Sequence, residues 1–218
     1  MNIVIVYAHP YDGSFCKGLL DTVVQHIEKR GANVKVKDLV KMNFDPVMRP
    51  DDLKAAKTMV YTEEVSKEQA DVLWADVIIT IAPVWFGMMP GFMKGYFDKV
   101  FITGFAYDHK GVGKLKGKRV FGLFTNGASD PYLEMVGQYE CTNLLMDNLF
   151  GMTGFTDVAV KYFQAVPAVP DKVRKQYLAD AIQFVDQIFE RQPGEIGQIG
   201  HARLLTKLVS NGYLNGRI

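Results

Sequence analysis

The stretch "DVIITIAPVWFGMMPGFMKGYFDKVF", residues 76–101, carries the clearest fold signal in this chain. It opens with an apolar, β-branched run, which is typical of a strand buried on both faces. It closes with an amphipathic helical pattern that begins at Pro90, a residue favoured in the first helical turn. Between strand and helix lie Trp85 and Phe86, two large aromatic residues in a turn. A strand followed directly by a helix predicts an α/β protein with a parallel sheet.

Four more apolar runs bounded by turn residues predict strands before and after this stretch. The five predicted strands cover residues 2–8, 33–39, 76–82, 119–125 and 157–163. Helical patterns separate or follow them at residues 14–31, 50–75, 90–101, 131–151 and 170–192, with one or two helices expected in 50–75. Only residues 33–39 alternate strictly, as an edge strand with one wet face does. The alternation predicts a doubly wound, five-stranded parallel sheet of order 2-1-3-4-5 with helices on both faces.

The size and composition fit one globular domain. The chain has 218 residues, of which 48% are hydrophobic and 22% are charged, enough to bury a full core. We expect residues 1–191 to form the domain and residues 192–218 to form a tail that packs on the domain or on a dimer partner. The sequence leaves open whether this tail wraps the other subunit or covers the mouth of the binding site.

Charge and cysteine content exclude several classes of partner. The 25 Lys and Arg residues nearly balance the 24 Asp and Glu residues, so neither nucleic acid nor an anionic membrane is indicated. Two cysteines without a Cys/His cluster indicate neither a metal site nor a disulfide framework, and they fit a reducing cytoplasm. The longest uncharged stretch, residues 77–93, is shorter than the roughly 20 apolar residues that span a bilayer, so no membrane insertion is expected.

The first candidate binding loop is "HPYDGSF", residues 9–15, which joins the first strand to a helix. The free N–H groups and positive dipole end of such a helix bind phosphate. Ser14 either caps this helix or donates its hydroxyl to the anion, and His9 adds a donor. The alternative is a capped turn with a solvated histidine.

Two more loops follow buried strands. Pro83 and Pro90 stiffen the turn that holds Trp85 and Phe86, and such a turn offers a flat wall to a planar ring; the alternative is that both aromatic side chains cover the core. In "TNGASDPY", residues 125–132, Asn and Gly favour a tight turn with exposed N–H donors; the alternative is an ordinary connection. Together the three loops fit a flat heterocycle with a phosphorylated tail, and flavin fits best.

These residues resemble a known family. "HPYDGSF", "PVWFGMMPGFMKGYFDKVF" and "GFAYDHKGVGKLKGKRV" are similar to motifs of the flavodoxin-like NAD(P)H:quinone oxidoreductases, which include DT-diaphorase, the modulator of drug activity and the ancillary proteins of potassium efflux. The resemblance extends in order and spacing over residues 1–163. It implies a flavodoxin-like fold, FAD as cofactor with FMN possible, NAD(P)H as co-substrate and a homodimer with its active site at the subunit interface.

The resemblance also implies roles for individual residues. The flavin phosphate end would contact His9, Ser14, Phe15 and Cys16. The ring would contact Pro83, Val84, Trp85, Phe86 and Gly87, with Thr125, Asn126, Gly127 and Ala128 along its other edge. From the partner subunit, Tyr107 and His109 would line the pocket. Cys16 departs from the asparagine usual in the family, and Tyr132 matches the family's tyrosine while Gln138 or Tyr139 stands near the place of its histidine partner.

The mechanism implied is a ping-pong transfer of hydride from NAD(P)H to the flavin and then to a quinone or similar flat electrophile. Tyr132, Tyr107 or His109 would donate a proton to the quinone oxygen, and backbone donors at residues 126–127 would favour the anionic reduced flavin. The alternatives are a flavin-binding regulatory subunit of a potassium efflux system, a nitro- or azo-compound reductase, and a one-electron carrier. The sequence does not choose between NADH and NADPH.

Three other residues are expected to have no catalytic role. We expect Cys141 to pack on a helix face, His26 to be solvated in its helix, and His201 in the tail to be structural or solvated.

Overall fold

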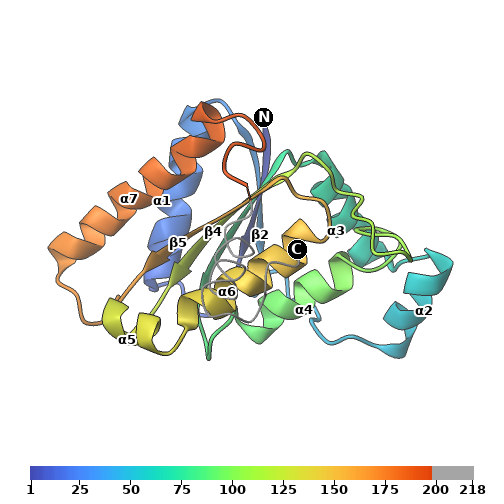
Figure 1. Cartoon of the computed structure of the whole chain (residues 1–218), viewed down its shortest axis with the longest axis horizontal. Coiled ribbons are helices and arrows are strands. Elements are labelled where there is room, and N and C mark those ends of the chain that lie inside the picture. The colour runs from blue at the N-terminus through green and yellow to red at the C-terminus, as the bar shows by residue number, and fades with distance from the viewer. Residues whose placement is uncertain (198–218) are drawn as a thin grey trace, which may run out of the picture.

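The computed structural model describes residues 1–197 and contains a five-stranded parallel sheet of order β2-β1-β3-β4-β5 (Figure 1). The strands are β1 (Asn2–Tyr7), β2 (Asn33–Asp38), β3 (Val77–Pro83), β4 (Arg119–Thr125) and β5 (Asp157–Phe163). Each strand begins and ends within one residue of its predicted bounds. The predicted fold class and strand order are confirmed.

Residues 50–75 form two helices, which is one of the two expected arrangements, and the predicted segment 131–151 is subdivided. The helices are α1 (Phe15–Lys29), α2 (Pro50–Thr58), α3 (Glu63–Trp74), α4 (Gly91–Val100), α5 (Asp130–Met135), α6 (Gln138–Met146), the π-helix η1 (Asp147–Gly151) and α7 (Asp171–Glu190). The prediction of one helix over residues 131–151 is wrong. Gly137 takes a left-handed φ of 68° between α5 and α6, and this conformation, favoured by glycine, ends the first helix and redirects the chain.

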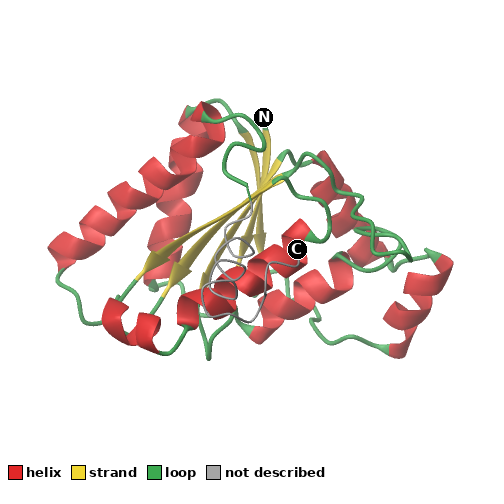
Figure 2. Cartoon of the chain, in the orientation of Figure 1, coloured by secondary structure: helices red, strands yellow, loops and turns green. Residues whose placement is uncertain are grey.

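Helices cover both faces of the sheet, as Figures 1 and 2 show: α1 and α7 lie on one side, and α3, α4 and α6 lie on the other. Because side chains alternate along a strand, Ile3 and Ile5 of β1 join the core under α1 and α7, whereas Val4 and Val6 join the opposite core. Burial on both faces explains why β1, β3 and β4 read as continuous apolar runs.

One contact between α1 and α7 corrects a sequence prediction. His26 is not fully solvated, since its Nε2 lies 2.8 Å from Asp186 Oδ1 and only 22% of its side chain is exposed. The histidine therefore joins the two helices that cover this face of the sheet.

The topology predicts a ligand-binding crevice between β1 and β3. The connection after β1 passes through α1 on one face, and the connection after β3 passes through α4 on the other face. In a doubly wound sheet this divergence opens a crevice at the carboxyl ends of the two strands, where ligands bind.

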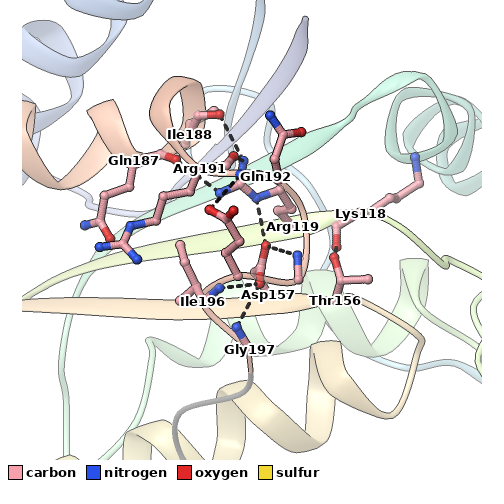
Figure 3. A network of polar contacts seen from close by, with 12 residues as sticks. Lys118, Arg119, Thr156, Asp157, Gln187, Ile188, Arg191, Gln192, Ile196 and Gly197 are labelled. Carbon is pink, nitrogen blue, oxygen red and sulfur yellow. Dashed lines mark hydrogen bonds and ion pairs between the residues drawn. The ribbon is translucent and has the colours of Figure 1, made fainter.

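A buried ion pair closes the opposite end of the sheet (Figure 3). Arg119 Nε donates to Asp157 Oδ2 at 2.9 Å, and the guanidinium also donates to carbonyls at the end of α7. Asp157 in turn accepts from the N–H groups of Gly194, Ile196 and Gly197. The chain after α7 is thereby attached to the amino end of β5.

The domain boundary at residues 191–192 stays a prediction, and the rest of the predicted tail, including His201, lies outside the described residues. Among residues 1–197, no helix combines the length and apolarity needed to cross a membrane.

Candidate cofactor site

Three loops meet at the carboxyl ends of β1, β3 and β4, as expected for this topology. Val84 N, just after β3, donates to Thr125 O at 2.8 Å. The Sγ of Cys16, in the first turn of α1, lies 3.2 Å from Thr125 Oγ1. Ala8 N, just after β1, donates to Ile81 O at 3.0 Å. These contacts join segments that lie far apart in the sequence into one site.

The first loop delivers the amino end of α1 to this site. Ser14 is the N-cap of the helix: its Oγ accepts from Lys17 N at 3.2 Å, so the capping role is the one observed. Phe15 and Cys16 begin the helix, and N–H groups at these positions have no acceptor within a helix. His9 is half-buried, and its Nδ1 accepts from Tyr11 N at 3.1 Å. The loop therefore offers N–H donors and a positive dipole end to an anion.

Cys16 is a buried packing residue of this loop. Its exposed fraction is 1%. Burial raises the pKa of the Cys16 thiol to about 11, so the thiol is neutral at physiological pH. A small neutral side chain here fits the contact with Thr125.

The second loop is a two-residue hairpin turn. Trp85 N donates to Met88 O at 2.9 Å, and Met88 N donates to Trp85 O at 3.2 Å. Between them, Phe86 and Gly87 have φ values of 47° and 90°. Two successive positive φ angles are the mark of a type I′ turn, which normally uses Asn or Gly because a bulky side chain is strained in this conformation.

The aromatic residues of this turn face outward. Phe86 is fully exposed, and Trp85 is 44% exposed while its ring meets Phe92 of α4 edge to face at 6.1 Å. The alternative that both side chains cover the core is wrong for Phe86. Burial within this chain does not offset the backbone strain at Phe86, because its side chain is exposed. A strained, exposed aromatic residue is typical of a surface that contacts a ligand or a partner.

Helix α6 supports the turn, which the sequence did not indicate. Thr142 Oγ1 donates to Gly87 O at 3.1 Å. The neighbouring Cys141 is exposed and not packed on a helix face, and its Sγ would lie 3.5 Å from a Cβ added at Gly87. No local sequence pattern marks Thr142 or Cys141. They lie next to the turn only because the chain after α5 brings α6 beside it.

The third loop differs from the predicted tight turn. Asn126 N donates to Phe163 O at 2.8 Å, so this N–H is used inside the sheet and is not an exposed donor. Gly127 does not have a positive φ, and a Cβ added there would meet no atom within 4 Å. Ala165 N donates to Ala128 O at 2.8 Å, which adds the loop after β5 to the wall.

The side chain of Asn126 provides a test for a bound group. Asn126 is 5% exposed, and its Nδ2 has no hydrogen-bond partner among the described residues. A buried amide without an acceptor costs about 1–3 kcal/mol, so such groups usually meet a ligand or water. An unpaired donor beside the open space at Gly127 fits a polar heterocycle at the carboxyl end of β4.

The predicted catalytic tyrosine of this region is accessible. Tyr132 lies on α5 and is 52% exposed. Tyr139 is committed elsewhere: its hydroxyl donates to Asp130 and accepts from Gln164 Nε2 at 2.9 Å. Burial and the Asp130 hydrogen bond raise the pKa of Tyr139 to about 12. Gln138 Nε2 donates to Thr142 Oγ1 at 3.0 Å. The polar groups of Gln138 and Tyr139 are thus hydrogen-bonded to other side chains, and neither is paired with Tyr132 as a histidine partner would be.

Tyr107 and His109 lie away from the crevice of their own chain. They belong to the connection between α4 and β4, which leads into the amino end of β4 at Arg119. Within this connection Gly104 N donates to Tyr107 O at 2.7 Å, and His109 is exposed. The structure therefore does not bring these two residues to the loops described above.

No group of three or more His, Cys, Asp or Glu side chains within residues 1–197 is arranged to hold a metal ion.

Comparison with known proteins identifies the family. The profile of the flavodoxin-like fold family matches residues 1–187. An uncharacterized NAD(P)H oxidoreductase of Haemophilus influenzae is 32% identical over 84% of this chain and 93% of its own length. The ribosyldihydronicotinamide dehydrogenase (quinone) of Mus musculus is 28% identical over 88% of this chain and 94% of its own length. This chain belongs to the flavodoxin-like NAD(P)H:quinone oxidoreductase family.

A solved structure supports the family assignment. The crystal structure of a protein from Streptococcus mutans superposes with a TM-score of 0.75 at 29% identity, covering 84% of this chain and 97% of that one. The family predicted from the loop motifs is thus confirmed.

Proposed function

We propose that this protein is a flavin-dependent NAD(P)H:quinone oxidoreductase. Relatives carrying NAD(P)H oxidoreductase and quinone dehydrogenase names align along 93% and 94% of their lengths, and this near-complete match carries the proposal. The crevice adds independent support, because it combines helix N–H donors, an outward-facing aromatic turn and an unpaired buried amide. No observation favours a transport-regulating subunit or a nitro- or azo-compound reductase over this activity.

The residues present fit a flavin. We assign the phosphate end to His9, Ser14, Phe15 and Cys16, the ring to Pro83, Val84, Trp85, Phe86 and Gly87, and the far edge of the ring to Thr125, Asn126, Gly127 and Ala128. When bound, a flavin accepts a hydride from NAD(P)H and delivers the two electrons to a quinone. FAD is our proposed cofactor, with FMN as the alternative, and NADH and NADPH are both candidate donors.

The chain's own groups bind and orient in this scheme. The N–H groups of Phe15 and Cys16 at the amino end of α1 hold a phosphate. The Ser14 Oγ accepts from Lys17 N, and its O–H can donate to the same anion. Asn126 Nδ2 donates to a polar edge of the ring, which satisfies a buried amide. Trp85 and Phe86 supply an apolar wall that excludes water.

Proton donation to the quinone oxygen is assigned to an exposed phenol. Tyr132 at the start of α5 is accessible for this role. Tyr107 and His109 reach a crevice only from a second copy, so we propose a homodimer whose active sites lie at the subunit interface. We also propose that the enzyme works in the cytoplasm.

The test begins with the visible absorption spectrum of the purified protein after incubation with FAD or FMN, followed by acid release and identification of the bound flavin. Anaerobic addition of NADH or NADPH should bleach the flavin bands, and menadione should restore them. Protein that retains neither flavin contradicts the proposal. A bound flavin that NAD(P)H does not reduce contradicts the oxidoreductase activity alone.

A variant pair sharpens this test. Asn126→Ala should weaken flavin retention about tenfold or more, which corresponds to about 1.4 kcal/mol. Asn148→Ala is the matched control, because Asn148 is exposed on η1 and lies outside the three loops. Equal flavin content in the two variants would remove Asn126 from the site.

A further inference from the structure

Hydrogen bonds hold the last described residues, up to Gly197, at the amino end of β5. Asp157 is completely buried, pairs with Arg119 at 2.9 Å and accepts the N–H groups of three residues after α7 (Figure 3). Val158 N then donates to Gly197 O at 3.0 Å. This bond lies on the outer side of β5, the edge strand. Whatever follows Gly197 therefore starts at the amino end of the β5 edge.

A hollow opens a short way along the same strand. It has a volume of about 410 Å³ between β5 and the α5–α6 pair, and Val160 and Tyr162 of β5 contribute to its wall. Val160 is two residues beyond Val158, a step of about 7 Å at the usual strand rise. The hollow is thus adjacent to the point where residue 198 begins.

The walls of this hollow combine apolar and acidic groups. Asp130 and Glu134 of α5 face it, with Lys161 as the one cation among the lining residues. Asp130 accepts hydrogen bonds from Tyr139 and Gln164, and these neutral donors leave its charge uncompensated. The hollow accordingly suits a segment that is basic and partly apolar.

The sequence after Gly197 has this composition. Residues 198–218 contain three basic residues, Arg203, Lys207 and Arg217, and no Asp or Glu. Of the 25 basic and 24 acidic residues of the chain, this leaves 22 basic and 24 acidic in residues 1–197, a formal charge of −2. Leu204, Leu205 and Leu208 supply the apolar side chains. Charge and hydrophobicity are therefore complementary between the segment and the hollow.

We propose that residues 198–218 dock into the hollow between β5 and the α5–α6 pair of their own chain. The segment belongs to the same chain, and the hydrogen bonds from Gly194, Ile196 and Gly197 to Asp157 fix its starting point, so this binding is intramolecular and weak contacts suffice to fill the hollow. Docking also covers the apolar edge strand, which otherwise invites pairing with other chains. Because Asp130 and Gln164 border the loops after β4 and β5, the docked segment supports one wall of the crevice.

Zero-length carbodiimide cross-linking of the full chain tests this proposal. Unlabelled and ¹⁵N-labelled protein are mixed, unfolded and refolded together, then cross-linked and digested. We expect Lys207 to be joined to Asp130 or Glu134, with both peptides carrying the same isotope, and Glu134→Gln to remove the Glu134 product. Mixed-isotope pairs place the segment on a second copy and overturn the proposal. Links from Lys207 only to other carboxylates, such as Asp12 near the first loop, or no link at all, overturn it too.

Hydrogen exchange supplies a second readout that does not depend on activity. Lys207→Glu in the full chain should speed amide exchange several-fold in the peptide covering residues 158–164, because it reverses the complementary charge. Lys110→Glu is the matched control, since Lys110 is an exposed loop residue with the same charge. Unchanged exchange in the Lys207→Glu variant, or an equal change in both variants, contradicts docking at this hollow.

Discussion

The Sγ of Cys16 lies 3.2 Å from the Oγ1 of Thr125, although 109 residues separate them. This contact joins the first turn of α1 to the end of β4, and so it connects the loop of residues 9–15 to the loop that carries Asn126. The Cys16 side chain is buried and its thiol is neutral at physiological pH, so the junction between the two loops is closed by an uncharged contact.

The two thiols should react at very different rates. Burial raises the pKa of Cys16 to about 11, so its reactive thiolate is scarce below that pH and forms only as the pH approaches it. Cys141 is exposed. Titration of native protein with a thiol-reactive disulfide reagent at pH 7.5 should modify one thiol per chain rapidly, and Cys141→Ser should abolish this fast phase. Two fast thiols in the native protein would contradict the burial of Cys16.

Gly127→Val should separate binding from folding. Gly127 does not have a positive φ and its Cβ position is open, so the unfolding free energy should change by no more than about 0.5 kcal/mol. The added side chain enters the proposed ring site and should raise the flavin dissociation constant about tenfold or more, or about 1.4 kcal/mol. Urea denaturation and flavin titration measure the two effects. Gly18→Val is the control, since a Cβ at Gly18 also meets open space but lies on α1; equal flavin affinity in both variants would count against the site.

The left-handed φ of Phe86 should lower the unfolding free energy by a measurable amount. Asn tolerates the left-handed conformation better than Phe, so Phe86→Asn should stabilise the flavin-free protein by about 1 kcal/mol. Phe86→Ala removes the ring but keeps an unfavourable residue at the positive φ, and should gain little. Both variants should lose flavin affinity if the ring shields the ligand. Chemical denaturation distinguishes the variants, and equal stability of the two would show that the turn is not strained.

Removing the Asp157 carboxylate should strongly destabilise the fold. Asp157→Ala leaves the Arg119 guanidinium buried without its counter-charge, a loss of about 3–5 kcal/mol for a buried pair. Asp171→Ala breaks a pair with Arg174 in which the carboxylate is 85% exposed and screened by solvent, so it should cost far less stability. Urea midpoints compare the two variants. Similar midpoints would mean that the buried pair contributes no more than a surface one.

Subunit mixing tests the proposed homodimer. Tyr107→Ala and Gly127→Val homodimers should each have low quinone reductase activity. A statistical mixture after joint refolding should recover about a quarter of the wild-type rate, because half of the twofold dimers are mixed and each has one intact site. If Tyr107 served the crevice of its own chain, mixing would restore nothing. Light scattering on the refolded samples verifies that dimers formed.

Local patterns in the sequence determined the strands, their parallel arrangement and the family. Apolar runs marked β1, β3 and β4 because both faces of these strands are covered, and alternation marked β2 as an edge. The loop motifs lie next to strand ends, so the doubly wound order alone brings them to one edge of the sheet. The spacing of apolar residues shows which faces of a strand or helix are buried. The strands and their order along the chain can therefore be predicted from local sequence alone.

Only the tertiary structure decided which polar groups are used inside the fold and which remain available. It paired Asn126 N with Phe163 O and left Asn126 Nδ2 unpaired, and it joined His26 to Asp186 across two helices. It also left Cys141 exposed. Such outcomes depend on which segments meet after the chain has folded, and residue types and spacing along one stretch do not contain that information.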